Sequence, residues 1–190
     1  MKIEELMRDK EYLEAVYNQF ILKRLIIKKG SDLSEAHVSK SDSNMEFAGF
    51  LLDNNKFIDV RNACILRISE HPKNPTNKRE GFFGWAVVGL YYSAYHAALS
   101  LVSKKGYSSK EHNATLCFII KNFSEFSIEE INLIDELQIK REEIEFYSGL
   151  KEERNKASYS TSLIFNKDKV YELREKSILL INKIKSILER

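Results

Sequence analysis

Six residues in the C-terminal third, from Arg154 to Tyr159, place a permanent cation and a phenol at a fixed spacing. The arginine guanidinium is a planar fork that suits phosphate, and the tyrosine supplies a hydroxyl donor and a ring that can stack. If both side chains reach one cleft, they would favour an anionic, ring-bearing ligand such as a nucleotide. Such residues more often have ordinary roles: Arg154 would pair with Glu152 or Glu153, and Tyr159 would be a core aromatic.

Two histidines are the other candidates for chemistry. His96 lies at the middle of a stripe of small and polar residues, spaced by four and three, which comprises Gly89, Ser93, His96, Ser100 and Ser103. Small side chains let another backbone come close, so this stripe predicts a tight helix contact or the floor of a polar cleft. A histidine in such a stripe is more often a hydrogen-bonded contact residue than a catalyst. His112 is expected in the first turn of a helix, where a neutral imidazole could donate to a phosphate, although a plain surface histidine is the more frequent case.

Composition limits the classes of protein. At 190 residues, with 43% hydrophobic and 31% charged residues, the chain has the balance of one globular domain, or of one domain with an appendage. Its 30 basic and 28 acidic residues nearly cancel, so any polyanion would have to bind a local patch. We expect such binding to use Arg154, with further basic residues as candidates: Lys73, Lys78, Arg79 and Lys156.

The cysteines and the termini bear on the compartment. Cys64 and Cys117 are far apart and form no CxxC motif, which argues against a metal site or a disulfide framework and fits a reducing cytosol. No signal peptide or membrane span is apparent, because Lys23 and Arg24 interrupt the apolar run near Phe20. We therefore expect a cytoplasmic protein that has no metal or cofactor.

The hydrophobic pattern is helical almost throughout, and no segment has the period of a strand. Apolar spacing predicts a long N-terminal helix that ends at Gly30, a helix over 34–54 and a less regular helical piece over 59–68. The segment 71–79 reads as a basic loop. The most apolar helix should run from Phe83 to Lys105 and end at Gly106. Capping boxes at Ser108 and Ser127 predict two more helices, and Asn166 is a plausible cap for the last one.

Four segments together resemble the HEPN domain family. These are Tyr91-Tyr92-Ser93-Ala94-Tyr95-His96-Ala97-Ala98, Lys105-Gly106-Tyr107, Ser109-Lys110-Glu111-His112 and Arg154-Asn155-Lys156-Ala157-Ser158-Tyr159. The resemblance covers the chain from about Ser34 onward. It implies an up-and-down helical bundle that dimerises through the helices bearing the arginine motif. Many HEPN proteins are metal-independent ribonucleases of toxin-antitoxin or phage-defence systems, some are paired with small nucleotidyltransferases, and others bind only nucleotides or partners.

The chain departs from the family pattern at one position. Active HEPN nucleases carry a histidine four to six residues after the arginine, and here that position holds Tyr159. A phenol with a pKa near ~10 is a poor general base at neutral pH, although it can still donate a hydrogen bond. On this resemblance Arg154 would bind phosphate, Tyr159 would take the proton-donor position and Asn155 would orient the phosphate or Arg154. His96 and His112 would be the candidates for the missing acid-base group.

We therefore expect an all-α, up-and-down bundle of HEPN type, with an N-terminal helical extension over 1–32, the bundle over 33–190 and an insertion over 59–80. We expect a homodimer and two main functional alternatives: a toxin-type ribonuclease, or a non-catalytic module that binds a nucleotide or a cognate nucleotidyltransferase. A purely structural interaction protein is a third, weaker alternative. RNA, a nucleotide and a nucleotidyltransferase antitoxin are the candidate partners. Sequence-specific reading of DNA and membrane association are not expected.

Overall fold

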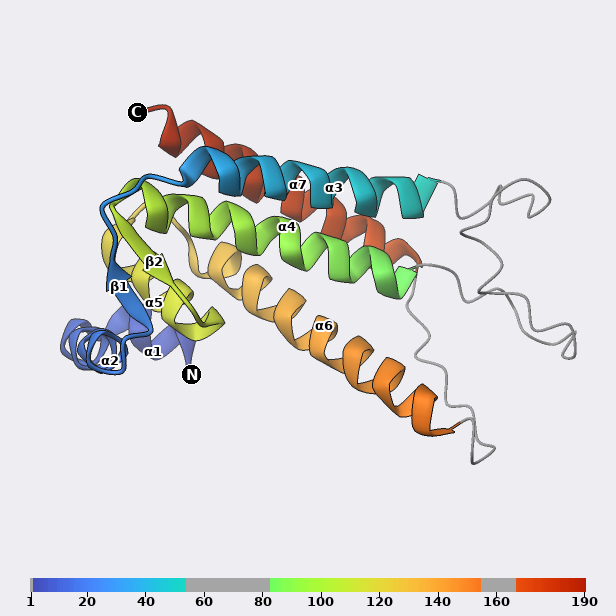
Figure 1. The fold of residues 1–190 in the computed structure, drawn as a ribbon, viewed down its shortest axis with the longest axis horizontal. Coiled ribbons are helices and arrows are strands. Elements are labelled where there is room, and N and C mark those ends of the chain that lie inside the picture. The colour runs from blue at the N-terminus through green and yellow to red at the C-terminus, as the bar shows by residue number, and fades with distance from the viewer. Residues whose placement is uncertain (1, 54–82, 155–166) are drawn as a thin grey trace, which may run out of the picture.

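The computed structural model describes residues 2–53, 83–154 and 167–190, with side chains described in α6 only as far as residue 142 (Figure 1). Four long helices form an antiparallel, up-and-down arrangement: α3 (Ser34–Asp53), α4 (Phe83–Lys104), α6 (Ile128–Arg154) and α7 (Lys167–Leu188). The expected all-α bundle is confirmed as a fold class. The segments predicted over 59–68 and 71–79 lie outside the described residues, as does Cys64.

The α4 helix is the centre of the bundle, as its two apolar stripes predict. Leu90, Ala94 and Leu101 are fully buried, and α3, α6 and α7 all pack against this helix. A helix that is apolar on several faces is stable only when other helices cover those faces. The expected end of this helix is also confirmed, because Gly106 adopts φ 77° just beyond it.

The small, polar stripe of α4 lies against α3. A Cβ atom added to Gly89 would lie 3.1 Å from the Cβ of Ala48, so the two backbones are in close contact there. The Ser93 hydroxyl donates to the carbonyl of Ser41 over 2.7 Å, and the amide of Leu33 donates to the Ser103 hydroxyl over 2.6 Å. Of the two alternatives predicted for the stripe, the tight helix contact is therefore the one observed.

The prediction of one long N-terminal helix is wrong. The segment forms α1 (Ile3–Arg8) and α2 (Lys10–Leu22), followed by the short strand β1 (Ile26–Lys28). Asp9 interrupts the helix because its carboxylate accepts a hydrogen bond from the amide of Tyr12, which makes Asp9 the N-cap of α2. Apolar spacing continues across this break, so periodicity alone did not reveal it.

The prediction that the chain contains no strands is also wrong, because the structure has two short strands. β1 pairs antiparallel with β2 (Tyr107–Ser109), with Ile27 opposite Ser108. Ser108 is therefore a strand residue, and α5 (His112–Asn122) begins later, with Glu111 at its N-cap. Three-residue strands are too short to show an alternating pattern, and their pairing depends on segments about 80 residues apart in the sequence.

The predicted start of α6 is confirmed, whereas the cap predicted for α7 is not described. At Ser127 the capping box is present, since the Ser127 amide donates to the Glu130 carboxylate over 2.8 Å and the Glu130 amide donates to the Ser127 hydroxyl over 3.3 Å. α7 begins at Lys167 and buries Val170, Leu173 and Ile184, as its spacing predicts. Asn166 lies outside the described residues.

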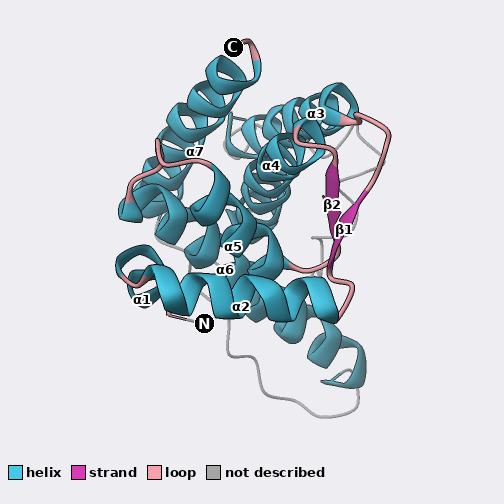
Figure 2. Ribbon diagram, turned by 90° about the vertical axis from the view of Figure 1, so that its left-hand side faces the viewer, coloured by secondary structure: helices cyan, strands magenta, loops and turns pink. Residues whose placement is uncertain are grey.

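The described part of the predicted extension over 1–32, from Lys2 onward, packs on the bundle. α1 and α2 lie across one end of the molecule, beside the strand pair (Figure 2). Leu6 is 1% exposed, and the ring of Tyr17 lies 6.2 Å from that of Phe118 on α5. The N-terminal helices thus share a core with the bundle. None of the described helices is sufficiently long and apolar to cross a membrane.

Candidate functional site

The arginine motif stands at the far end of α6. Arg154 is the last residue of this helix, and Asn155 and Tyr159 follow it outside the described residues. α6 runs away from the end of the bundle that holds α5 and the strands (Figure 1). The cleft predicted between Arg154 and Tyr159 therefore stays a prediction. Beyond residue 142 the structure describes only the backbone of α6, as far as Arg154.

His96 makes a hydrogen bond within the α3–α4 contact. Its Nδ1 atom lies 3.2 Å from Nδ1 of His37, and the two ring centroids are 5.4 Å apart. Both rings are half-buried, and burial lowers the pKa of each. A neutral pair in which one ring donates to the other satisfies this geometry. In the described chain His96 is thus a contact residue with His37 as its partner.

His112 is buried at the start of α5 and pairs with α6. It is 9% exposed, and its Nε2 atom lies 3.3 Å from a carboxylate oxygen of Asp135. Burial lowers the pKa of His112, and the nearby Asp135 carboxylate partly opposes that shift. Nδ1 of His112 is buried with no hydrogen-bond partner among the described residues. His112 is therefore not the plain surface histidine that the sequence allowed.

An arginine that sequence reasoning missed lies in the same region. The Arg141 guanidinium stacks over the ring of Tyr91 at 4.8 Å and donates a hydrogen bond of 3.2 Å to the Tyr92 hydroxyl. Tyr91 also faces Tyr95, with ring centroids 5.6 Å apart, and burial raises the pKa of both phenols. The spacing of Tyr91 and Tyr95 by four residues was visible in the sequence.

The aromatic rings connect this arginine to the histidine of α5. The centroid of the His112 ring lies 6.0 Å from that of Tyr91 and 5.9 Å from that of Tyr95. An imidazole, a carboxylate, a guanidinium and three phenols from α4, α5 and α6 thus form one cluster, which we call the His112 cluster: Tyr91, Tyr92, Tyr95, His112, Asp135 and Arg141. No local motif links Asp135 or Arg141 to His112, because these residues meet only through packing.

The described histidines and the arginine motif lie far apart in one chain. α6 rises by about 1.5 Å per residue, so the backbone of Arg154 lies about 28 Å along the helix from Asp135. Arg141 is about 20 Å from Arg154 on the same helix. Tyr92 contacts Arg141, and His96 is one turn further along α4, towards the end where α6 begins. Neither His96 nor His112 is therefore near Arg154 in the same chain.

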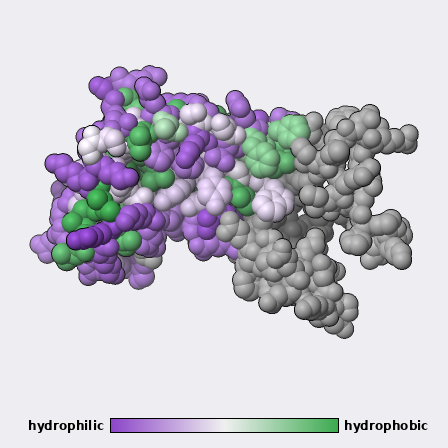
Figure 3. Space-filling model, in the orientation of Figure 1, coloured by the Kyte–Doolittle hydropathy of each residue, from purple (hydrophilic) through white to green (hydrophobic). Residues whose placement is uncertain are grey.

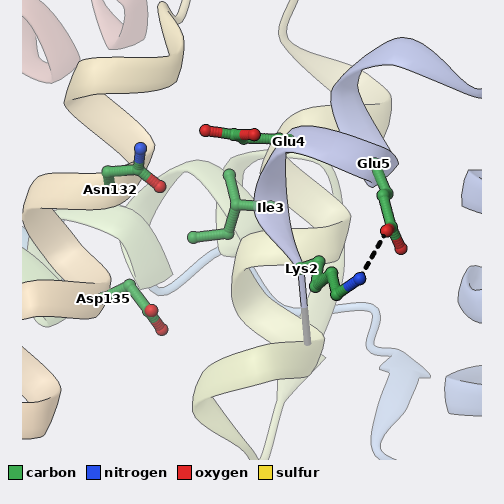
Figure 4. Close-up of a pocket in the computed structure, with 6 residues that line it drawn as sticks. All are labelled: Lys2, Ile3, Glu4, Glu5, Asn132 and Asp135. Atoms are coloured by element: carbon green, nitrogen blue, oxygen red, sulfur yellow. Dashed lines mark hydrogen bonds and ion pairs between the residues drawn. The ribbon is translucent and has the colours of Figure 1, made fainter.

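A hollow of about 350 Å³ borders the His112 cluster where α1 meets α6. Asp135 and Asn132 line it from α6, opposite Ile3 and Glu4, and Lys2 pairs with Glu5 at 2.8 Å (Figure 4). Three carboxylates and one paired lysine make this hollow unfavourable for a phosphate. Among the described residues, no group of three or more His, Cys, Asp or Glu side chains could hold a metal ion.

Comparison with known proteins leaves the family open. The chain matches no protein-family model, and no curated protein matches it significantly. The resemblance to HEPN domains therefore stays a prediction that rests on the motifs quoted above.

Proposed function

We propose that this protein is a HEPN-type helical module that binds a phosphate-bearing ligand, RNA or a nucleotide, through its arginine motif and does not cleave it. One observation carries the choice of binding over cleavage: His37, His96 and His112 lie far along the bundle from Arg154, while His71 lies outside the described residues. RNA cleavage without a metal needs a group that transfers protons near neutral pH, next to the cation that holds the phosphate. His96 is bonded to His37 and His112 to Asp135, each within the bundle. Tyr159 follows the arginine where active relatives carry a histidine.

Binding and cleavage can be measured with one labelled RNA in buffer that contains EDTA. We expect wild-type protein to bind a short fluorescein-labelled RNA, or a nucleotide in competition with it, and to leave the RNA intact on a denaturing gel. Arg154→Ala should weaken binding by about 10- to 100-fold, because hydrogen bonds to charged groups contribute about 1.5–3 kcal/mol. Arg8→Ala is a matched control, since it removes an exposed arginine at the end of α1.

Tyr159→His tests the assignment of the motif. This variant restores the ring that active HEPN relatives carry at the corresponding position. A gain of RNA cleavage, absent from Arg154→Ala/Tyr159→His, would support a silenced HEPN site. Wild-type cleavage that survives EDTA and is lost in Arg154→Ala would instead overturn the non-catalytic proposal.

A second candidate is a toxin-type ribonuclease that uses the His112 cluster, although the hollow that borders this cluster is acidic. There an imidazole with a carboxylate partner shares one cluster with the Arg141 guanidinium. In this alternative His112 transfers protons and Arg141, not Arg154, stabilises the charge on the phosphate. His112→Gln should then abolish cleavage, while Arg154→Ala should leave it in place. A cognate nucleotidyltransferase antitoxin would be expected only for this candidate or for a partner-binding module.

A further inference from the structure

The strand pair brings together two basic segments that are far apart in the sequence. Lys28 lies opposite Tyr107, and the amide of Lys29 donates to the carbonyl of Gly106 over 2.7 Å. At the other end of the pair, the amide of Lys110 donates to the carbonyl of Leu25 over 3.0 Å. The strands and their flanks carry seven exposed cations, which we call the basic ribbon: Lys23, Arg24, Lys28, Lys29, Lys104, Lys105 and Lys110.

The charges of the basic ribbon are only partly offset by the described residues around it, because Asp32 lies within electrostatic range of Lys104. None of the seven cations forms an ion pair with a described residue, whereas Lys121, Lys183 and Lys185 elsewhere on the molecule each pair with a carboxylate. The segments 20–34 and 103–112 contain these seven basic residues and two acidic residues, Asp32 and Glu111. A chain whose total net charge is only +2 thus presents a concentrated positive surface.

Arg24 has a backbone conformation that is strained for any residue with a side chain. Its φ is 54°, in the left-handed region. The amide of Leu25 donates to the carbonyl of Phe20, and the amide of Arg24 donates to that of Ile21. These two bonds form a Schellman motif, in which the left-handed position is usually glycine. The same strand pair has glycine, Gly106, at the end of α4. An arginine at a position where glycine is less strained indicates that its side chain has a role there.

The surroundings of the basic ribbon favour a phosphate backbone over a lipid surface. Its exposed apolar residues are aliphatic, and Leu22 is the most exposed at 82%. Of the described aromatic residues that are exposed, Trp85, Phe47 and Phe50 lie at the opposite ends of α3 and α4. Tyr12, which is 39% exposed, lies in the first turn of α2, away from the end of that helix where the ribbon begins. Figure 3 shows hydrophilic residues around a smaller hydrophobic patch at the end of the molecule with α2 and the strands.

We infer that the basic ribbon is a docking surface for the phosphate backbone of a nucleic acid. The cations fall into two groups at the two ends of the strand pair. The four steps from Leu25 to Lys29 separate these groups by about 13 Å at 3.3 Å per residue. Lysine and arginine contacts at two points along a backbone position a nucleic acid without reading its sequence. This inference does not depend on the arginine motif of α6.

Charge reversal on the basic ribbon tests the inference, with binding of a labelled single-stranded RNA measured across a salt series. Lys28→Glu/Lys104→Glu should weaken binding by at least about tenfold. It should also make the plot of log affinity against log salt shallower by about 1.4, because each phosphate contact on a single strand contributes about 0.7. Lys169→Glu/Lys176→Glu, an equal change of charge at exposed positions of α7, should have little effect. An equal loss in the two double variants would overturn the inference.

Arg24→Gly separates binding from folding. Glycine relieves the left-handed strain, so the melting temperature should not fall and should rise by up to about 2–4 °C, while RNA affinity falls. A variant that melts at a lower temperature and keeps its full affinity for RNA would contradict the role given to Arg24. A wild-type protein that binds vesicles with anionic phospholipid but not RNA would identify a lipid surface instead. Loss of binding in Arg154→Ala but not in the ribbon variants would support the arginine motif alone.

Discussion

His37 and His96 show how a candidate catalytic residue can have a structural partner. A ring that donates Nδ1–H to the other Nδ1 needs at least one neutral imidazole in the pair. When both rings are cationic, two Nδ1–H donors and two positive charges would face each other across 3.2 Å. Lys40 on α3 adds a further positive charge that lowers both pKa values, and the Tyr95 ring lies 6.3 Å from that of His96. We therefore expect the α3–α4 contact to depend on pH.

Acidification should weaken the fold through these residues. Folded-state pKa values of His37 and His96 are below the ordinary value of 6.5, so the unfolded chain binds more protons. Their contribution to stability is fully present above about pH 6.5 and is lost as the pH falls below it. We expect the free energy of unfolding from urea titrations to fall less steeply with acidification in His96→Gln than in wild type.

His112 contributes with the same sign, so some pH dependence should remain in that variant. Above pH 7.5 the pH dependence of the two proteins should be alike, which provides an internal control. Identical dependence of wild type and His96→Gln across the acid range would mean that the pair does not titrate on unfolding.

Among the helices, α4 illustrates how local pattern translates into packing. Its apolar stripes face three neighbouring helices, and its small residues lie where α3 comes closest. Gly89 is the clearest case, because any larger side chain would press on Ala48 and on the carbonyl of Asn44, 3.3 Å from an added Cβ.

Leu90→Ala measures how much α4 contributes to the core. Leu90 is fully buried, so its truncation should cost about 2–5 kcal/mol in the free energy of unfolding. Leu179→Ala on α7 is the control, because Leu179 is 70% exposed and should change stability by less than about 0.5 kcal/mol. A loss of less than about 1 kcal/mol for Leu90→Ala would argue against its place in the centre of the bundle.

For the molecule as a whole, the N-terminal segment and the bundle share one hydrophobic core. Ile26 in β1 is 2% exposed, Phe118 in α5 is 1% exposed, and Lys121 pairs with Glu14. The boundary predicted near residue 32 falls between β1 and α3, and so separates one strand from its partner β2.

A chain that starts at Gly30 should reveal this dependence. It lacks α1, α2 and β1, which leaves Phe118 uncovered and β2 unpaired. We expect the melting temperature to fall by at least about 10 °C. The truncation should cost several kcal/mol, and each kcal/mol lowers the melting temperature of a chain of this size by about 2–4 °C. If this chain fails to fold, Leu6→Ala in the full chain should still cost about 2–5 kcal/mol. An unchanged melting temperature would show that residues 33–190 are an independent domain.

Helix positions and burial follow from local features of this chain. The ends of α3 and α4, the capping box at Ser127 and the buried stripe of α7 were all predicted, because spacing and capping act within a few residues. Two short strands and the break at Asp9 were missed, since strand pairing joins remote segments and apolar spacing runs through the break.

The candidate sites depended far more on tertiary structure. Sequence reasoning singled out His96 and His112, but their partners His37 and Asp135 are 59 and 23 residues away. The basic ribbon was also missed, because its two lysine-rich segments become one surface only when β1 pairs with β2. Residue types limit the chemistry that a chain can perform. Which of those residues meet is decided by long-range packing, whose energy comes from burying apolar surface that many sequences share.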